Sequence, residues 1–402
     1  MTSPQQVLTV LLIWIVVAPA AMAAEAKQEP TNDVANGTFA ALWDEILQGA
    51  SLRADTLMFG LIQHPVDSGL NPNNIQEIPR YQLELDVRPD IFLTFRRLDL
   101  SFKPRLEVFW REWQDGIRSG ESETEADLFL NEWRVRYRIS DELIASYGLE
   151  NLQWGPSYLL SPSNPFSRNN GQNNPRLLVP RLDYFRLIWI PSYEWTLSFI
   201  ANTDEGRLEQ RRDFQETFAL KLDYTGFQKY ASLILSTQHG DDLTIGFFAG
   251  WSASDAILLY TEGRLSNDID KSAILIGSAY TFAFGPTIAV EFFHDGDGCT
   301  LDPFELCFLP DMGDADFTDV LIRQNYLLLQ YVHTEIWDRF NLTLRWIHNL
   351  DDQSHRLINV VDYEVTDHIQ LFTIGTFDLG DTDAEFGSLG DYSIMLGVQY
   401  AF

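Results

Sequence analysis

The carboxy-terminal stretch DYSIMLGVQYAF alternates between two kinds of residue. Every second residue from Tyr392 to Phe402 is apolar or aromatic, and most residues between them are small or polar. A period of two is that of a β-strand with one apolar and one polar face. The stretch EWRVRYRI, residues 132–139, repeats the pattern with arginine on the polar face. We therefore predict a chain built mainly from two-faced strands.

Downstream of residue 23 the chain has no apolar run of the roughly 18 residues that a membrane helix needs. Such a chain is either soluble or crosses a membrane with strands, which must then close into a barrel because lipid offers the backbone no hydrogen-bond partners. The 11 Trp, 15 Tyr and 27 Phe residues favour a barrel. Aromatic girdles are what a barrel places at both membrane interfaces.

The alternation predicts eighteen strands, or sixteen if the first of them does not cross the membrane. The predicted strands are residues 53–63, 81–95, 100–113, 128–138, 142–152, 182–190, 194–202, 214–224, 229–237, 243–251, 256–265, 272–282, 286–294, 322–334, 339–349, 355–365, 369–378 and 392–402.

The connections between these strands sort by length, and transmembrane barrels have short periplasmic turns and longer outer loops. We therefore predict an all-β fold for residues 51–402, a transmembrane antiparallel β-barrel of 16 to 18 strands. A soluble β-sandwich is the alternative, since its connections can alternate too. The tight connections are residues 139–141, 191–193, 253–255, 284–286, 337–339 and 366–368, and the long ones are residues 64–80, 114–127, 153–181, 203–213, 295–321 and 379–391.

The amino-terminal residues have a different pattern. An 11-residue apolar run is followed by Ala21-Met22-Ala23, which predicts a signal peptide over residues 1–23. Residues 24–50 are then a periplasmic segment, in which FAALWDEILQG, residues 39–49, has the spacing of a short helix. We expect this helix to pack below the barrel, with entry into the lumen as the alternative.

Two stretches resemble known proteins. The terminal LGVQYAF, which ends in Phe402, resembles the assembly signal of Gram-negative outer-membrane barrels. That resemblance implies the outer membrane of a Gram-negative bacterium, a surrounding lipid bilayer, and recognition of the last strand by the outer-membrane assembly machinery. The stretch YGLENLQWGPSYLLSPSNPF, residues 147–166, resembles the Trp-Gly step and Asn-Pro loop of large porin-like families.

The strongest functional pattern is basic. It lies on the polar faces of two neighbouring strands, where a hairpin loop over residues 114–127 would bring Arg105 near Arg136 and Glu107 near Arg134. Clustered like charges are unfavourable when dry. They imply a hydrated lumen, opposing carboxylates such as Glu84 and Asp86, or an anionic solute. Alternatively, ion pairs between acids and arginines only stabilise the interior of the barrel. The predicted pore-lining residues on these strands are Lys103, Arg105, Glu107, Arg111, Arg134, Arg136 and Arg138.

The long segment 153–181 is rich in proline and asparagine, which favours a defined shape. It is long enough to fold inward as a constriction, where Arg168 and Arg176 would join the basic residues. A loop on the outer surface is the alternative.

Cys299 and Cys307 lie eight positions apart in a predicted outer loop, and in an oxidising compartment a disulfide is the favoured interpretation. The nearby Asp295, Asp297 and Asp302 lack the terminal Glu of an EF-hand, so no metal is expected there. The sequence contains no H-E-x-x-H, G-x-S-x-G or phosphate-loop motif, so we expect neither an enzyme nor a cofactor.

Together these patterns predict an outer-membrane channel for small hydrophilic solutes with an arginine-lined lumen. The formal net charge of -30 makes nucleic acid a poor partner. Two other classes stay open: an outer-membrane enzyme, and a plugged barrel that serves export, adhesion or assembly. The solute and the oligomeric state are not indicated by the sequence.

Overall fold

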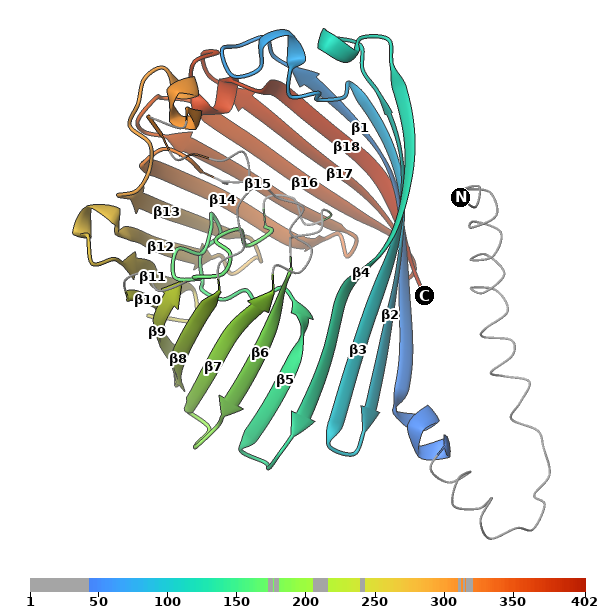
Figure 1. Ribbon diagram of the computed structural model, residues 1–402, viewed down its shortest axis with the longest axis vertical. Helices are drawn as coiled ribbons and strands as arrows, with labels where there is room; N and C mark the ends of the chain where they lie inside the picture. The colour runs from blue at the N-terminus through green and yellow to red at the C-terminus, as the bar shows by residue number, and fades with distance from the viewer. Residues whose placement is uncertain are drawn as a thin grey trace, which may run out of the picture.

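The computed structural model describes residues 43–172, 176, 181–204, 216–238, 243–309, 312, 313, 315 and 321–402. Within this part of the chain eighteen strands form one antiparallel sheet in sequence order, and β18 pairs with β1 to close it (Figure 1). The predicted barrel is confirmed, at the upper of the two expected strand numbers. The predicted signal peptide over residues 1–23 lies outside the described residues.

The strands are longest in β1 to β4 and shortest in β5 and β6. Their bounds are β1 Ala50–Pro65, β2 Tyr81–Phe95, β3 Leu98–Glu112, β4 Ser122–Arg138, β5 Leu143–Glu150, β6 Leu182–Trp189, β7 Trp195–Asp204, β8 Thr217–Gly226, β9 Lys229–Gln238, β10 Thr244–Ser252, β11 Ile257–Leu265, β12 Ala273–Thr281, β13 Thr287–Asp295, β14 Asn325–Ile336, β15 Phe340–Asn349, β16 His355–Thr366, β17 Ile369–Leu379 and β18 Gly390–Ala401.

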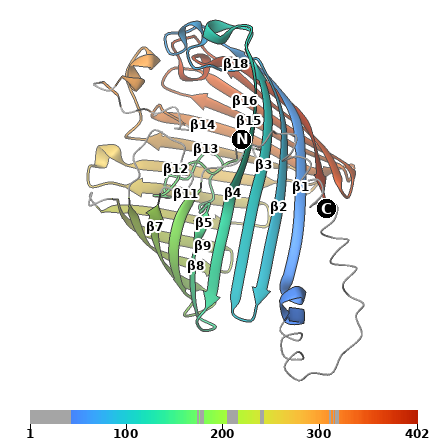
Figure 2. The same ribbon diagram turned by 45° about the vertical axis from the view of Figure 1, so that its right-hand side comes forward.

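The barrel has a short-turn end and a long-loop end (Figure 2). Every even-numbered strand before β18 passes to the next through a tight turn, of which residues 96–97, 227–228 and 367–368 are the shortest. Every odd-numbered strand leads into a connection at the opposite end, where the long segments lie. Among the described residues, no helix is long and apolar enough to cross a membrane.

Closure explains the alternation of the terminal strand. Val398 faces Met58 of β1 across the seam, and Leu396 faces Gly60. Phe402 completes the seam, because its amide donates to the carbonyl of Ala54 at 3.0 Å and its carbonyl accepts from the amide of Ala54 at 2.9 Å. The first and last strands therefore leave no unpaired edge along this seam.

The outward face of the barrel is apolar along its length. Leu128 and Leu396 are 58% and 68% exposed there. A sheet that faces water would not expose so many large apolar side chains. Aromatic side chains gather near the short-turn end, where Trp337 packs edge-on against Phe340 at 5.9 Å and Tyr280 against Phe282 at 4.8 Å. This distribution is that of an aromatic girdle.

A short helix over residues 43–49 precedes β1 at the short-turn end (Figure 1). Its Glu45 forms an ion pair with Arg96, in the turn between β2 and β3, at 3.1 Å. The described part of the amino-terminal segment therefore lies at the rim of the barrel and does not enter the lumen.

Candidate pore interior

One part of the barrel interior is charged. We call the inner face of β2 to β6 the charged wall, because its side chains form a continuous series of ion pairs between neighbouring strands. The pairs that include predicted pore-lining residues are Lys103 with Glu132 at 2.7 Å, Arg105 with Asp90 at 2.9 Å, Arg111 with Glu125 at 3.5 Å, Arg134 with Glu150 at 3.1 Å, and Asp99 with both Arg136 at 2.9 Å and Arg138 at 3.1 Å.

The predicted pairing of β3 with β4 is confirmed, but the predicted register between them was wrong. Arg136 lies opposite Asp99, and Arg105 lies opposite Phe129. The polar run ESETEAD, residues 121–127, is typical of a loop, but residues 122–127 belong to β4, so the hairpin turn lies closer to the amino terminus than predicted. A bulge at Lys103 and Pro104 shifts the register once more. Acids therefore interleave with the arginines, and the expected cluster of like charges does not form.

The charged wall remains open to water in part. The side chains of Arg134, Arg136 and Arg138 are 29%, 36% and 49% accessible. Because guanidinium groups present five donors in a planar fork, an arginine held by one carboxylate still offers N–H groups to a carboxylate or phosphate of a solute.

The segment between β5 and β6 folds into the barrel, as the constriction hypothesis required. Figure 1 shows its described part, residues 151–172, within the ring of strands. Two wall glutamates with no exposed surface, Glu262 on β11 and Glu291 on β13, attach it. Glu291 accepts the amides of Tyr158 and Leu159 at 2.7 and 3.0 Å. We call residues 151–172 the inner loop.

The second attachment explains the Trp-Gly step in the sequence. Glu262 accepts hydrogen bonds from the hydroxyls of Ser161 and Ser163 at 2.5 and 2.7 Å. Gly155 sits against the same carboxylate, since a Cβ at this position would lie 2.2 Å from Oε2 of Glu262. Its φ of +89° also favours glycine. Glycine is therefore the residue that lets the inner loop approach the wall this closely.

The two loop arginines contact strands far from the charged wall. Arg168 forms an ion pair with Asp295 on β13 at 2.7 Å. Arg176 pairs with Asp362 on β16 at 2.5 Å and lies over the ring of Phe372 at 4.6 Å. The carbonyl of Arg176 accepts from Arg88 of the charged wall at 2.8 Å. Acids on β13 and β16 therefore hold these two side chains, and their part in lining the pore beside the basic residues of β3 and β4 stays a prediction.

Another part of the interior carries a cluster of buried apolar side chains. We call this cluster on the inner face of β11 to β18 the apolar wall, and the same face also holds Glu262 and Glu291. Leu275, Leu328 and Ile347 on this wall are at most 1% exposed, and Leu159 and Leu160 of the inner loop pack in the same cluster. Burying this surface favours the inward position of the loop at roughly 25 cal/mol per Å². The inner loop thus lies on the apolar side of the barrel.

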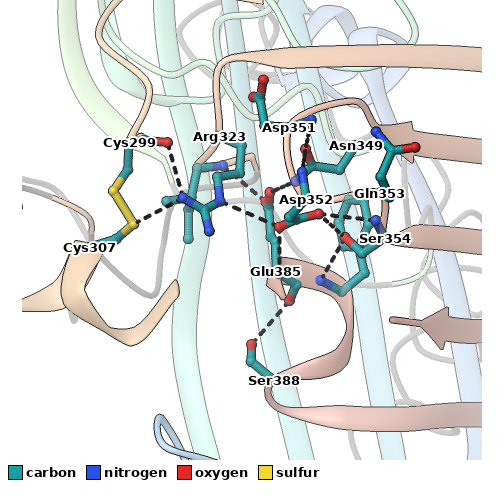
Figure 3. A network of polar contacts seen from close by, with 12 residues as sticks. Cys299, Cys307, Arg323, Asn349, Asp351, Asp352, Gln353, Ser354, Glu385 and Ser388 are labelled. Carbon is teal, nitrogen blue, oxygen red and sulfur yellow. Dashed lines mark hydrogen bonds and ion pairs between the residues drawn. A yellow bond between two sulfur atoms is a disulfide. The ribbon is translucent and has the colours of Figure 1, made fainter. Parts of the chain in front are cut away.

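A network of polar contacts joins three loops at the long-loop end (Figure 3). Cys299 and Cys307 form a disulfide, and Arg323 donates to the carbonyl of Cys299 at 3.5 Å and pairs with Asp352 at 3.4 Å. Glu385 accepts the amide of Ile322 at 3.0 Å. The disulfide was predicted from the sequence, but the contacts of Arg323 and Glu385 were not, because they join loops without periodicity.

Burial raises the pKa of Glu385 to about 7, and the neighbouring Asp352 acts in the same direction. The hydroxyl of Tyr326, the amide of Ile322 and the guanidinium of Arg356 oppose the shift without cancelling it. Beside the network lies a cavity of about 370 Å³ lined by Thr300, Asp302, Arg323, Asp351, Asp352, Asp381, Asp383 and Ala384.

Comparisons with known proteins agree with this architecture. No protein-family model matches the chain, and no curated protein sequence matches it. Among solved structures, OprD of Pseudomonas aeruginosa is 11% identical with a TM-score of 0.54, and the match covers 89% of this chain and 96% of OprD. OccK5 (OpdH) of the same organism is 11% identical with a TM-score of 0.53, over 88% of this chain and 98% of OccK5. A variant of a Rhodopseudomonas blastica porin is 13% identical with a TM-score of 0.46, over 88% and 100%.

The closed sheet of eighteen antiparallel strands has a β-barrel fold like that of OprD and OccK5. At these identities the likeness is one of fold.

Proposed function

We propose that this protein is an outer-membrane channel through which small hydrophilic solutes diffuse along the charged wall. The observation that carries the proposal is the unequal covering of the interior. The inner loop packs on the apolar wall, whereas Arg134, Arg136 and Arg138 stay accessible to water. Barrels of this strand number are wide enough for an aqueous lumen when loops do not fill it.

The same architecture supports a location in the outer membrane. An apolar outward face and an aromatic girdle suit a bilayer, and a closed barrel leaves no backbone edge in lipid. We assign the short-turn end to the periplasm and the long-loop end to the outside, since this is how outer-membrane barrels distribute their connections. The assembly machinery would recognise the terminal strand, which ends in Phe402.

We propose that the accessible arginines give the passage a preference for anionic solutes such as small carboxylates. Charged rings and ladders set selectivity where a pore is narrow, whereas distant charge acts mainly on approach. The acids of the charged wall hold the guanidinium groups in place, and the accessible N–H groups face the solute. Arg168 and Arg176 are candidates for a lesser role, because each is paired with an acid beyond this wall.

The test is single-channel recording of the purified protein in a planar bilayer under a salt gradient. We expect discrete steps and a reversal potential that favours anions, and Arg136→Glu should move that potential toward cations. Arg96→Glu is the matched control, because Arg96 pairs with Glu45 at the rim. Equal shifts in both variants would remove the charged wall from the mechanism.

A barrel closed by its own loop is the second candidate function, and the attachment of the inner loop favours it. Glu262 and Glu291 are both fully buried and both accept hydrogen bonds from that loop. A folded protein without conductance would support this reading, and a role in export, adhesion or assembly would replace transport. We propose no catalytic role, because these two glutamates serve the attachment of the loop.

A further inference from the structure

One serine of the charged wall is buried without a hydrogen-bond partner. Ser146 lies on β5 and is 5% exposed, and its Oγ forms no hydrogen bond with any described residue. The strand register places Ser146 directly opposite Arg136 of β4 on one side and Arg186 of β6 on the other. A buried polar group without a partner is unfavourable. This hydroxyl between two arginines therefore points to an acceptor that the described chain does not supply.

The arginines beside Ser146 are only partly satisfied. Arg186 forms no hydrogen bond with any residue in the described ranges, and its ion pair with Glu150 is long at 3.7 Å. Its Nε is buried without a partner. The Nε of Arg134, the next inward residue from Arg136 on β4, is unpartnered in the same way, although its Nη1 donates to Glu150 at 3.1 Å. Three buried donor atoms on neighbouring strands thus lack an acceptor.

The positive charge of this region exceeds the negative charge. Glu150 reaches Arg134 and Arg186 through one oxygen, Oε2, and its Oε1 accepts from neither. The side chain of Arg186 is 22% accessible and those of β4 are more so, which lets an ion in the lumen reach them. Four guanidinium groups share two carboxylates here, which leaves a net charge of +2. These groups belong to Arg134, Arg136, Arg138, Arg186, Asp99 and Glu150.

We propose that Arg134, Arg136, Ser146 and Arg186 bind the phosphate group of a small phosphorylated solute, and we call these four residues the phosphate site. A phosphate monoester carries a charge of about −1.5 to −2 at pH 7 and three acceptor oxygens. Guanidinium groups bind such oxygens in a bidentate manner, and the hydroxyl of Ser146 supplies a further donor. A single carboxylate offers two oxygens and one charge, so it would leave donors unpaired and charge unbalanced.

Passage of phosphorylated solutes rests on the proposed function, but binding at the phosphate site does not, because the site needs access to water from one end of the barrel only. A phosphate group held there would cancel the positive charge of the region and occupy part of the lumen. We therefore expect phosphate to reduce the chloride current through the channel and to weaken its preference for anions.

Binding is tested without conductance by titrating sodium phosphate, at pH 7 and fixed ionic strength, into the full-length folded protein with isothermal calorimetry as the readout. We expect one site, which Arg186→Gln weakens by roughly tenfold or more because a guanidinium group is lost. Ser146→Ala removes one hydrogen bond to a charged group and should weaken binding by roughly threefold to tenfold. Binding at wild-type strength by Arg186→Gln would overturn the site.

Matched controls separate the phosphate site from general charge and from folding. Arg96→Gln removes one positive charge at the rim, where Arg96 pairs with Glu45, and Ser198→Ala removes a buried hydroxyl from β7. Both should bind phosphate as the wild type does. Folded barrel in every variant is scored by its altered mobility before heating in detergent gels. An equal loss in Arg96→Gln and Arg186→Gln would refute the site, since charge alone would then account for binding.

Sodium acetate identifies the class of ligand, because it should bind the wild type roughly tenfold or more weakly than phosphate does. Equal affinities would refute the preference for phosphate. Single-channel recording of chloride current with and without phosphate then separates the site from the channel. Phosphate binding by a protein that gives no conductance would refute the proposed function alone. Anion-selective conductance without phosphate binding would refute the phosphate site alone.

Discussion

The charged wall and the apolar wall are built from the same two-faced strands, yet they differ in what covers them. Leu275 and Leu328 on the apolar wall have no exposed surface because the inner loop and its neighbours pack over them. Arg136 and Arg138 on the charged wall keep more than a third of their side-chain surface accessible. Covering apolar surface lowers the free energy of the protein, whereas covering a charged side chain raises it because the charge loses its hydration. The distribution of side chains on the inner faces thus decides where a loop settles and where water stays.

Removal of the inner loop should break this contrast most severely. Replacement of residues 156–170 by a short Gly-Ser linker uncovers the apolar wall, and single-channel conductance should rise roughly threefold or more because the loop no longer occupies the lumen. Replacement of residues 114–120 in the outer hairpin between β3 and β4 is the control and should leave conductance unchanged. Equal conductance in both proteins would mean that the inner loop does not limit the passage.

A truncation on the apolar wall should affect stability and leave selectivity alone. Leu328→Ala creates a cavity at a position without exposed surface, so the free energy of unfolding should fall by about 2–5 kcal/mol. Ile117→Ala in the outer hairpin, where the side chain is 53% exposed, should change it by less than about 0.5 kcal/mol. Denaturant titration of the folded barrel measures both. An altered reversal potential in Leu328→Ala would contradict the division of roles.

The loop network at the long-loop end should weaken as pH rises. The pKa of Glu385 is about 7 in the folded protein, above its ordinary value of 4.5. The folded state therefore binds the proton more tightly than the unfolded state does. The resulting contribution to the free energy of unfolding is complete below pH 4.5 and is lost as the pH rises through 7. The upper limit is about 3 kcal/mol. The amide of Ile322 donates a hydrogen bond to Glu385. Hydrogen exchange at this amide should be slower at pH 5 than at pH 8 after correction for intrinsic rates.

Glu385→Gln supplies the control for this dependence, because the amide keeps the neutral charge at every pH. Exchange at Ile322 should then lose its pH dependence after the same correction. If the pH dependence survives in Glu385→Gln, it belongs to another group that faces this position. The charged groups there are Asp352 and Arg356.

The smallest effect is expected from one shared acid of the charged wall. Asp99 holds both Arg136 and Arg138, so Asp99→Asn frees two guanidinium groups and should raise the anion-to-cation permeability ratio by roughly twofold. Glu45→Gln removes the acid of a comparable pair at the rim and should leave the ratio unchanged. The reversal potential under a salt gradient measures both, and a shift toward cations in Asp99→Asn would contradict the role of these arginines.

Much of the fold could be predicted from the sequence because the information is local. Alternation marks each strand, and the lengths of the connections mark its direction, so the barrel and all eighteen strands followed. The register of β3 against β4 did not follow. Residues 121–127 are polar and look like a loop, but at the long-loop end a strand can extend beyond the apolar zone and needs no alternation there.

The interior was predicted less completely, for a different reason. The inner position of Arg134, Arg136 and Arg138 follows from their alternation, but their acidic partners depend on register across strands. Glu262 and Glu291 look like ordinary inner-face residues in the sequence. Their attachment of the inner loop spans about a hundred positions or more along the chain, which no local pattern encodes.

That separation has a consequence for how the barrel forms. The inner loop emerges between β5 and β6, but its docking sites lie on β11 and β13. Contacts between such distant positions carry a large entropy of loop closure and form late or slowly. An assembling barrel therefore keeps an unobstructed interior until those strands are in place, and narrowing of the lumen belongs to the final stage of folding.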